Sequence, residues 1–249
     1  MTDPVIAQGP EHATSRRIPW PIVWGLGAAL FLLAIVWFGR EVTEGDGASI
    51  DRAIMLAMRV AGHPDQPAGP AWLPSAMRDV TALGSSTVLT FVVIAAAVFL
   101  WLHGKLRSAL LVVLATTLGS VVVTVIKALV GRARPDLFER LMAETSHSFP
   151  SGHAANSAIV YLTLATLLFP VLSERRMRGF VLAVALLVVG AIGASRVYLG
   201  VHWPSDVLAG WVFGCGWALL SWKLELRLFD TAPVIPAKAG TEGPAGIAE

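Results

Sequence analysis

Three short groups of residues carry the side chains that could do chemistry in this 249-residue chain. Each group combines cations, histidines or small polar residues at the end of a hydrophobic segment: Lys127 and Arg134; Ser151, Gly152 and His153; Arg196, His202 and Asp206. Only the histidines and the aspartate among them could bind a metal, whereas three cations suit an oxyanion that must be held and attacked. The residue types therefore favour phosphoryl transfer without a metal.

The composition places this chemistry in a membrane. Hydrophobic residues make up 55% of the chain and charged residues 14%, and a membrane-spanning helix needs about 20 apolar residues. Six segments qualify as candidate spans: residues 20–38, 86–102, 109–126, 154–172, 180–194 and 207–222. The sequence thus predicts an all-α, polytopic membrane protein whose domain, residues 19–230, is a bundle of six transmembrane helices.

The segments outside the spans are predicted to be minor. Residues 1–18 form an N-terminal tail, and residues 231–249, which are polar and rich in Pro, Gly and Ala, form a disordered C-terminal tail. Between the first two spans, apolar residues recur at helical spacing from Ile50 to Ala61, while Asp51, Arg52 and Arg59 fall elsewhere on the helical wheel. This pattern predicts a short amphipathic helix on the outer surface. Residues 63–74 are rich in Pro and Gly and predict a loop.

Basic residues in the short loops predict the orientation. Lys105 and Arg107 lie between the second and third spans, and three arginines lie between the fourth and fifth. By the positive-inside rule these loops and both termini face the cytoplasm. All three chemical groups then emerge on the opposite face, so they can form a single site. We expect the inner (cell) membrane of a bacterium, with the site facing the periplasm or the cell exterior.

An anion-binding cradle follows from five of these residues. The guanidinium groups of Arg134 and Arg196 and the ammonium group of Lys127 can hold a doubly charged phosphate. Ser151 and Gly152 stand immediately before a predicted helix, where a hydroxyl and free backbone N–H groups meet the positive end of the helix dipole.

The remaining three residues predict the reaction itself. His202 precedes Asp206 by one helical turn, so the carboxylate can fix the imidazole tautomer and stabilise its cation. This arrangement is typical of a nucleophilic histidine. His153, beside a glycine at the start of a helix, is suited to act as the general acid that a leaving alkoxide needs.

The three groups together resemble a known signature. The patterns Lys127-x6-Arg134-Pro135, Pro150-Ser151-Gly152-His153 and Ser195-Arg196-x5-His202-x3-Asp206 are similar to the three-part signature of the type 2 phosphatidic acid phosphatase family, which vanadium-dependent haloperoxidases share. The resemblance covers about residues 78–222. It implies that His202 forms a phosphohistidine, Asp206 orients it and His153 protonates the leaving group. It also implies phosphate binding by Lys127, Arg134, Ser151, Gly152 and Arg196, with no metal and no cofactor.

Other interpretations remain open at this stage. Each group alone fits a structural role. Lys127, Arg132 and Arg134 could be a cationic anchor at a helix end, Pro150, Ser151 and Gly152 a turn and cap, and His202 an interfacial residue. A transporter of anionic solutes or lipids would also use cations near the membrane, although such folds usually show paired broken helices. A haloperoxidase-like enzyme would hold vanadate in the same cradle. Gly210 and Gly214 are assigned to helix packing.

The sequence therefore predicts an integral membrane phosphatase that hydrolyses a lipid phosphomonoester or a lipid diphosphate. A site at the mouth of a helix bundle lets the lipid chain stay in the bilayer while the headgroup reaches the polar residues. Undecaprenyl diphosphate, phosphatidic acid and phosphatidylglycerol phosphate are the candidate substrates. We expect no nucleic-acid partner and no obligatory protein partner.

Overall fold

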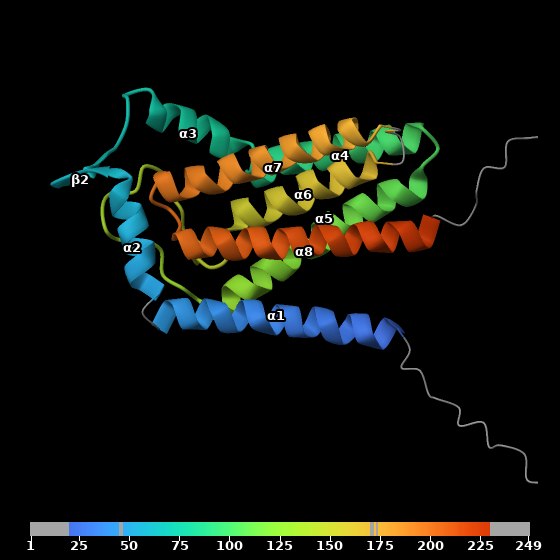
Figure 1. Ribbon diagram of the computed structural model, residues 1–249, viewed down its shortest axis with the longest axis horizontal. Helices are drawn as coiled ribbons and strands as arrows, with labels where there is room; N and C mark the ends of the chain where they lie inside the picture. The colour runs from blue at the N-terminus through green and yellow to red at the C-terminus, as the bar shows by residue number, and fades with distance from the viewer. Residues whose placement is uncertain (1–19, 45–46, 170–171, 173, 230–249) are drawn as a thin grey trace, which may run out of the picture.

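Six long helices lie alongside one another in the computed structural model, which describes residues 20–44, 47–169, 172 and 174–229. They are α1 (Trp20–Glu44), α4 (Ser86–Leu102), α5 (Leu106–Val130), α6 (Gly152–Leu167), α7 (Arg175–Tyr198) and α8 (Pro204–Phe229). The shorter elements gather toward one end of the bundle (Figure 1): α2 (Gly47–Ala57), β1 (Arg59–Val60), β2 (His63–Pro67) and α3 (Leu73–Ala82). The predicted tails, residues 1–18 and 231–249, lie outside the described residues.

The bundle has the surface of a multi-pass membrane protein. Among the described residues, α1, α5, α7 and α8 are long and apolar enough to cross a membrane, and α3 with α4, bent by 44°, counts as a fifth span if the pair is one. Large apolar side chains such as Leu33 and Leu187 are 65% and 72% exposed on the outside of the bundle, which suits contact with lipid. Each of the six predicted spans corresponds to a helix, but the fourth, predicted to reach residue 172, ends earlier: α6 stops at Leu167 and has only 16 residues, fewer than a span usually needs.

Helix α6 lies inside the bundle and packs most extensively on α8. Two glycines of α8 permit this approach: a Cβ on Gly214 would lie 2.5 Å from Ala158 Cβ and 2.7 Å from the Ala155 carbonyl oxygen. A Cβ on Gly210 would lie 2.9 Å from the carbonyl oxygen of Ser151. Both distances to backbone are shorter than a real Cβ tolerates, so the prediction that these glycines serve helix packing is confirmed. The contact holds the N-terminal ends of α6 and α8 together.

The predicted loop at residues 63–74 is wrong in part, because only residues 68–72 lie outside helices and strands. Residues 63–67 form β2, which pairs antiparallel with β1, and α3 begins at Leu73. The amphipathic helix predicted from Ile50 to Ala61 is present as α2 but ends at Ala57. Gly62, at φ +80°, allows the chain to reverse, and the Ala68 N–H then donates to the Met58 carbonyl at 3.0 Å. The hairpin thus provides hydrogen-bond partners for the backbone groups that follow α2. A longer helix would otherwise have provided them.

The buried face of α2 includes a charged residue. Asp51, which the helical wheel placed away from the apolar residues, is only 3% exposed, and Met55 is fully buried beside it. Ile50 and Ile54 are 67% and 40% exposed instead. Burial of a carboxylate requires a partner that offsets its desolvation, and that partner lies at the functional site described below.

Gly214→Ala should lower the stability of the protein. The added methyl group has no room between α8 and α6, and overpacking of this kind costs about 1–3 kcal/mol. Gly190→Ala in α7 is the matched control, because a Cβ there meets nothing within 4 Å and alanine favours helix. Thermal unfolding of the three proteins in detergent, followed by circular dichroism, should show a lower Tm for Gly214→Ala alone. Equal Tm values would contradict the packing argument.

Candidate active site

Helix α5 ends about one turn after Lys127, its last basic residue. Gly131 adopts a left-handed conformation, with φ +66°, and its N–H donates to the carbonyl oxygen of Lys127 at 3.0 Å. A glycine in this conformation is a common helix C-cap. The chain leaves α5 after Val130, about one turn beyond Lys127, and carries Arg132 and Arg134 across the end of the bundle. The first basic group is thus split between a helix end and an extended segment.

The start of α6 is fixed by its own cap and by α8. The Ser151 side chain accepts a hydrogen bond from the Ala154 N–H at 3.4 Å, so Ser151 is the N-cap of α6. The Ser151 N–H donates to the carbonyl oxygen of Asp206 at 3.0 Å. On the preceding loop, the Ser148 N–H donates to the Arg132 carbonyl at 2.8 Å. These backbone bonds bring the three sequence groups to one place.

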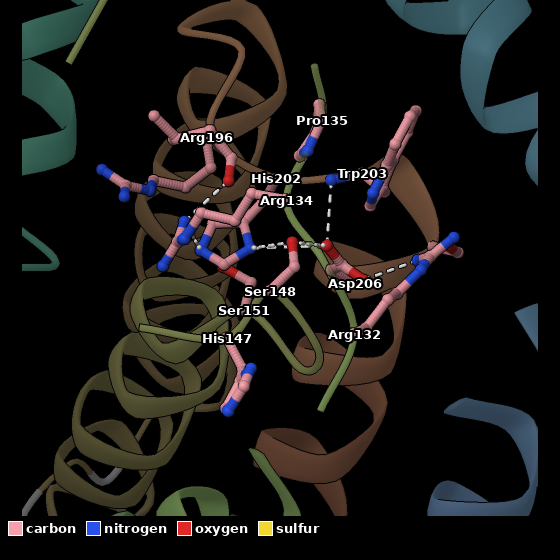
Figure 2. Close-up of polar contacts among 12 residues, drawn as sticks. Arg132, Arg134, Pro135, His147, Ser148, Ser151, Arg196, His202, Trp203 and Asp206 are labelled. Carbon is pink, nitrogen blue, oxygen red and sulfur yellow. Dashed lines mark hydrogen bonds and ion pairs between the residues drawn. The ribbon is translucent and has the colours of Figure 1, made fainter. Parts of the chain in front are cut away.

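His202 lies in the short connection between α7 and α8. Gly200, at φ +77°, turns the chain after α7, and Asp206 falls in the first turn of α8. The distance from His202 Nδ1 to Asp206 Oδ2 is 3.5 Å. Oδ2 also accepts hydrogen bonds from Ser148 Oγ at 2.5 Å and from the Trp203 N–H at 2.9 Å. Figure 2 shows the Asp206 carboxylate at the centre of these contacts.

The other imidazole nitrogen of His202 faces a cation. Arg134 Nη1 lies 3.2 Å from His202 Nε2, and because a guanidinium group has only donors, Nε2 must accept this hydrogen bond. The proton is therefore on Nδ1, the nitrogen directed at Asp206. Burial lowers the pKa of His202 to about 3, although Asp206 opposes the shift. His202 is thus neutral near pH 7, and the electron pair of its unprotonated Nε2 is directed at Arg134.

Protein groups hold each of the three predicted phosphate-binding cations. Arg134 is held by the Val201 carbonyl at 2.7 Å and the Ser146 carbonyl at 2.7 Å. Arg196 is fully buried and donates to Thr81 Oγ1 at 3.1 Å. Lys127 Nζ donates to the carbonyl oxygen of His147 at 2.8 Å. Protein groups fix all three cations before any ligand binds, as an anion-binding site requires.

Glu144 is an anionic side chain within this cationic cluster. Its carboxylate accepts a hydrogen bond from Arg196 Nη2, and its second oxygen lies 3.5 Å from Arg134 Nη2. Burial alone would raise the pKa of Glu144, but the charges of Arg196 and Arg134 hold it below its usual value. Glu144 is therefore ionised near neutral pH and occupies donors that an incoming phosphate would use.

The structure brings the predicted residues to the same end of the bundle. Gly152 lies beside Lys127, because a Cβ on Gly152 would be 3.6 Å from Lys127 Cε. His153 is within electrostatic range of Arg196 and Arg134. No hydrogen bond of its ring is found among the described residues. His147, which the sequence left outside the site, contributes its carbonyl oxygen, and its ring stands apart from His202 in Figure 2.

Four further residues contribute that the sequence analysis missed: Asp51, Arg132, Glu144 and Ser148. Arg132 was noted only as part of a possible cationic anchor. A signal existed for Arg132, which stands between Lys127 and Arg134 and shares their charge. Nothing in the local sequence distinguishes Ser148 or Glu144 from the other polar residues of the same loop.

Comparisons with known proteins agree with this geometry. Residues 108–230 match the model of the PAP2 superfamily. The chain is 35% identical to a phosphatidylglycerophosphatase B of Bacillus subtilis over 75% of this chain and 88% of that protein. It is 39% identical to an undecaprenyl-diphosphatase of Sulfolobus acidocaldarius over 36% of this chain and 37% of that protein.

A solved structure matches over most of the fold. It is the crystal structure of the first transmembrane PAP2 type phosphatidylglycerolphosphate phosphatase from Bacillus subtilis. The TM-score is 0.71 at 29% sequence identity, and the match covers 82% of this chain and 98% of that one.

Glu144→Gln should tighten the binding of inorganic phosphate. Loss of the carboxylate charge frees Arg196 and Arg134, and a partly exposed ion pair contributes up to about 1 kcal/mol, which corresponds to about a 2–5-fold lower Ki. Glu139→Gln, an exposed change in the same loop, is the matched control and should leave the Ki unchanged. Competitive inhibition by phosphate measures the effect. A Ki that is unchanged or higher in Glu144→Gln would show that the carboxylate does not compete with phosphate.

Proposed function

Because the chain belongs to the PAP2 superfamily and is a membrane lipid phosphatase, we propose that it acts through a phosphohistidine formed on His202. We propose phosphatidylglycerol phosphate as the first candidate substrate, with phosphatidic acid and undecaprenyl diphosphate as the others. A relative that the match covers over 88% of its length is named for the first, and a shorter match is named for undecaprenyl diphosphate. The observation that carries the mechanism is His202 Nε2, unprotonated and 3.2 Å from Arg134, with Asp206 behind Nδ1.

The first step transfers the phosphoryl group to the enzyme. The Nε2 electron pair of His202 attacks phosphorus, an N–P bond forms, and the P–O bond to the lipid breaks. For this step His153 must be in its protonated form, which the negative charge of a bound phosphate would favour. As the general acid it then gives that proton to the leaving oxygen, a role that contributes about 10²–10⁴-fold to the rate. The imidazole becomes cationic during the attack, and the Asp206 carboxylate at 3.5 Å from Nδ1 stabilises that charge.

The second step returns the enzyme to its starting state. His153, now neutral, removes a proton from a water molecule as the water attacks phosphorus. The N–P bond breaks, inorganic phosphate leaves, and the electron pair returns to Nε2 of His202. Microscopic reversal of the acid role makes His153 the base in this step, as happens in other two-step hydrolases. The lipid product is released after the first step.

Several hydrogen-bond donors are positioned to bind the phosphate oxygens. Arg196 Nε is buried and has no hydrogen-bond partner within the described residues, and a buried unpaired N–H is costly unless a ligand uses it. Lys127 lies beside Gly152, where α6 offers backbone N–H groups and the positive end of its dipole. Arg134 adds a second guanidinium group. These donors would stabilise charge on the phosphoryl oxygens in both transition states.

We propose that no metal takes part. Within residues 20–44, 47–169, 172 and 174–229, no cluster of three or more His, Cys, Asp or Glu side chains could hold a metal ion. The arginine and lysine side chains of the cradle provide the positive charge that a metal would otherwise bring to phosphate.

A groove supports a lipid as the substrate. It has a volume of about 510 Å³ and lies between α4, α5 and α6. Apolar side chains such as Leu89, Val121 and Ile159 line it together with Ser, Thr and Asn side chains. Ser86 and Asn156 line it near the first residues of α4 and α6, and a Cβ on nearby Gly84 would lie 3.4 Å from His153. The groove thus approaches the site from the side of the bundle, where an acyl or prenyl chain would lie.

We further propose that all six long helices span the membrane, with both termini in the cytoplasm. In this arrangement α6 crosses as a short, enclosed helix: ten of its 16 residues are buried by the surrounding helices, so it needs little contact with lipid. The basic loops then lie on the cytoplasmic side, and the site faces the periplasm or the cell exterior of a bacterium.

Phosphate release from lipid phosphates tests this function. Purified protein in detergent with EDTA should release phosphate from at least one of phosphatidylglycerol phosphate, phosphatidic acid and undecaprenyl diphosphate. His202→Ala should abolish release because it removes the nucleophile. A short-chain, water-soluble analogue of the preferred lipid should be a poorer substrate, since it leaves the groove empty.

The controls separate the parts of the proposal. His147→Ala, whose ring stands apart from His202 (Figure 2), should retain activity. Activity that EDTA removes and Mg²⁺ restores would overturn the metal-free mechanism. Turnover that survives in His202→Ala would overturn the nucleophile, and equal rates with long and short chains would overturn the role of the groove.

A further inference from the structure

Arg132 connects the candidate catalytic carboxylate to a second buried carboxylate. Its Nη1 donates to Asp206 Oδ1 at 2.6 Å, and its Nη2 donates to Asp51 Oδ2 at 2.9 Å. All three side chains are buried. Figure 2 shows Arg132 on the side of Asp206 that faces away from His202. The two oxygens of Asp206 thus have separate tasks, with Oδ2 toward His202 and Oδ1 toward Arg132.

The network closes through the first turn of α8. The Ser205 N–H donates to Asp51 Oδ1 at 2.9 Å, and Ser205 Oγ donates to Asp51 Oδ2 at 2.5 Å. Arg132 Nη1 also donates to Ser205 Oγ at 2.7 Å, and Nη2 donates to the Val42 carbonyl at 2.8 Å. Each oxygen of Asp51 therefore accepts at least one hydrogen bond. The geometry of Arg132 is fixed by α1, α2 and α8 at once.

The balance of charge explains why a second carboxylate is useful. If Asp206 were the only partner of Arg132, the positive charge of Arg132 would neutralise the negative charge of Asp206. That negative charge is what stabilises the His202 imidazolium. Asp51 supplies one negative charge to the far side of the guanidinium group, so Asp206 retains its own for His202. Buried charges interact strongly because little water screens them. Loss of the Asp51 charge should therefore weaken the stabilisation of the His202 imidazolium, although the two residues are not in contact.

We infer that Asp51 and Arg132 are positioning residues for the phosphatase reaction, and that helix α2 contributes to catalysis through them. Neither side chain reaches the cradle around His202 Nε2, so they act only through Asp206. This inference rests on the proposed role of Asp206 in supporting the nucleophile. Helix α2 then has a function in the reaction, because it holds the Asp51 carboxylate that balances part of the charge of Arg132.

Asp51→Asn is the central test, because it removes one charge with almost no change in shape. The kcat for phosphate release should fall by about 10–100-fold, which is the effect of replacing residues that hydrogen-bond to metal ligands and orient them. The KM should change less than about twofold, because the phosphate cradle is untouched. Asp51→Glu should restore part of the kcat. Asp65→Asn, an exposed change in β2, is the matched control and should retain full activity.

A double-mutant cycle with Asp206→Asn distinguishes positioning from general structural damage. If Asp51 acts through Asp206, adding Asp51→Asn to Asp206→Asn should change kcat less than about twofold. A full further loss in that background, or a normal kcat in Asp51→Asn alone, would overturn the inference. Near-normal turnover in Asp206→Asn would instead overturn the proposed function of Asp206 itself.

Ser205→Ala provides the same test if Asp51→Asn does not fold. It removes hydrogen bonds to Asp51 and Arg132 without a change of charge. The kcat should fall with KM nearly constant, and the effect should again disappear in the Asp206→Asn background. An unchanged kcat, or a loss of equal size in both backgrounds, would count against Asp51 and Arg132 as positioning residues.

Discussion

The buried carboxylate of Asp206 is the point on which the site depends. It accepts hydrogen bonds from Ser148 and the Trp203 N–H, pairs with Arg132, and lies behind His202. These partners come from the loop before α6, the segment after α5 and the connection between α7 and α8. A carboxylate without such partners would not remain charged in this position. The same contacts therefore join these segments at this end of the bundle and support His202, the proposed nucleophile.

The membrane environment explains how large apolar, small and charged residues are distributed over the helices. Outside the bundle the helices present large apolar side chains, whereas inside it small residues allow close approach, as Gly214 does against Ala155 and Ala158. This close packing sets the start of α6 beside the start of α8, so the helix dipole of α6 and the nucleophile meet. The arginine and carboxylate side chains of the site lie at one end of the bundle and are paired with one another, which avoids the high cost of isolated buried charges.

Much of this arrangement could be predicted from the sequence because it depends on local patterns. Apolar segments of sufficient length predicted the positions of the long helices, and the spacing from His202 to Asp206 predicted their contact, found at 3.5 Å. The network around Arg132 was not predictable, because Asp51 is distant from it in the chain and resembles a solvated residue of an amphipathic helix. The hairpin was missed because its strands are short and polar, and pairing rather than periodicity defines them.

The central claim is that phosphate passes through Nε2 of His202. The most direct measurement is to mix the enzyme with labelled lipid phosphate, quench in alkali, which preserves phosphohistidine, and locate the label in peptides by mass spectrometry and ³¹P NMR. The account predicts label on Nε2 of His202 that appears before free phosphate accumulates. Label on Nδ1, on another residue, or on no residue during turnover would contradict it.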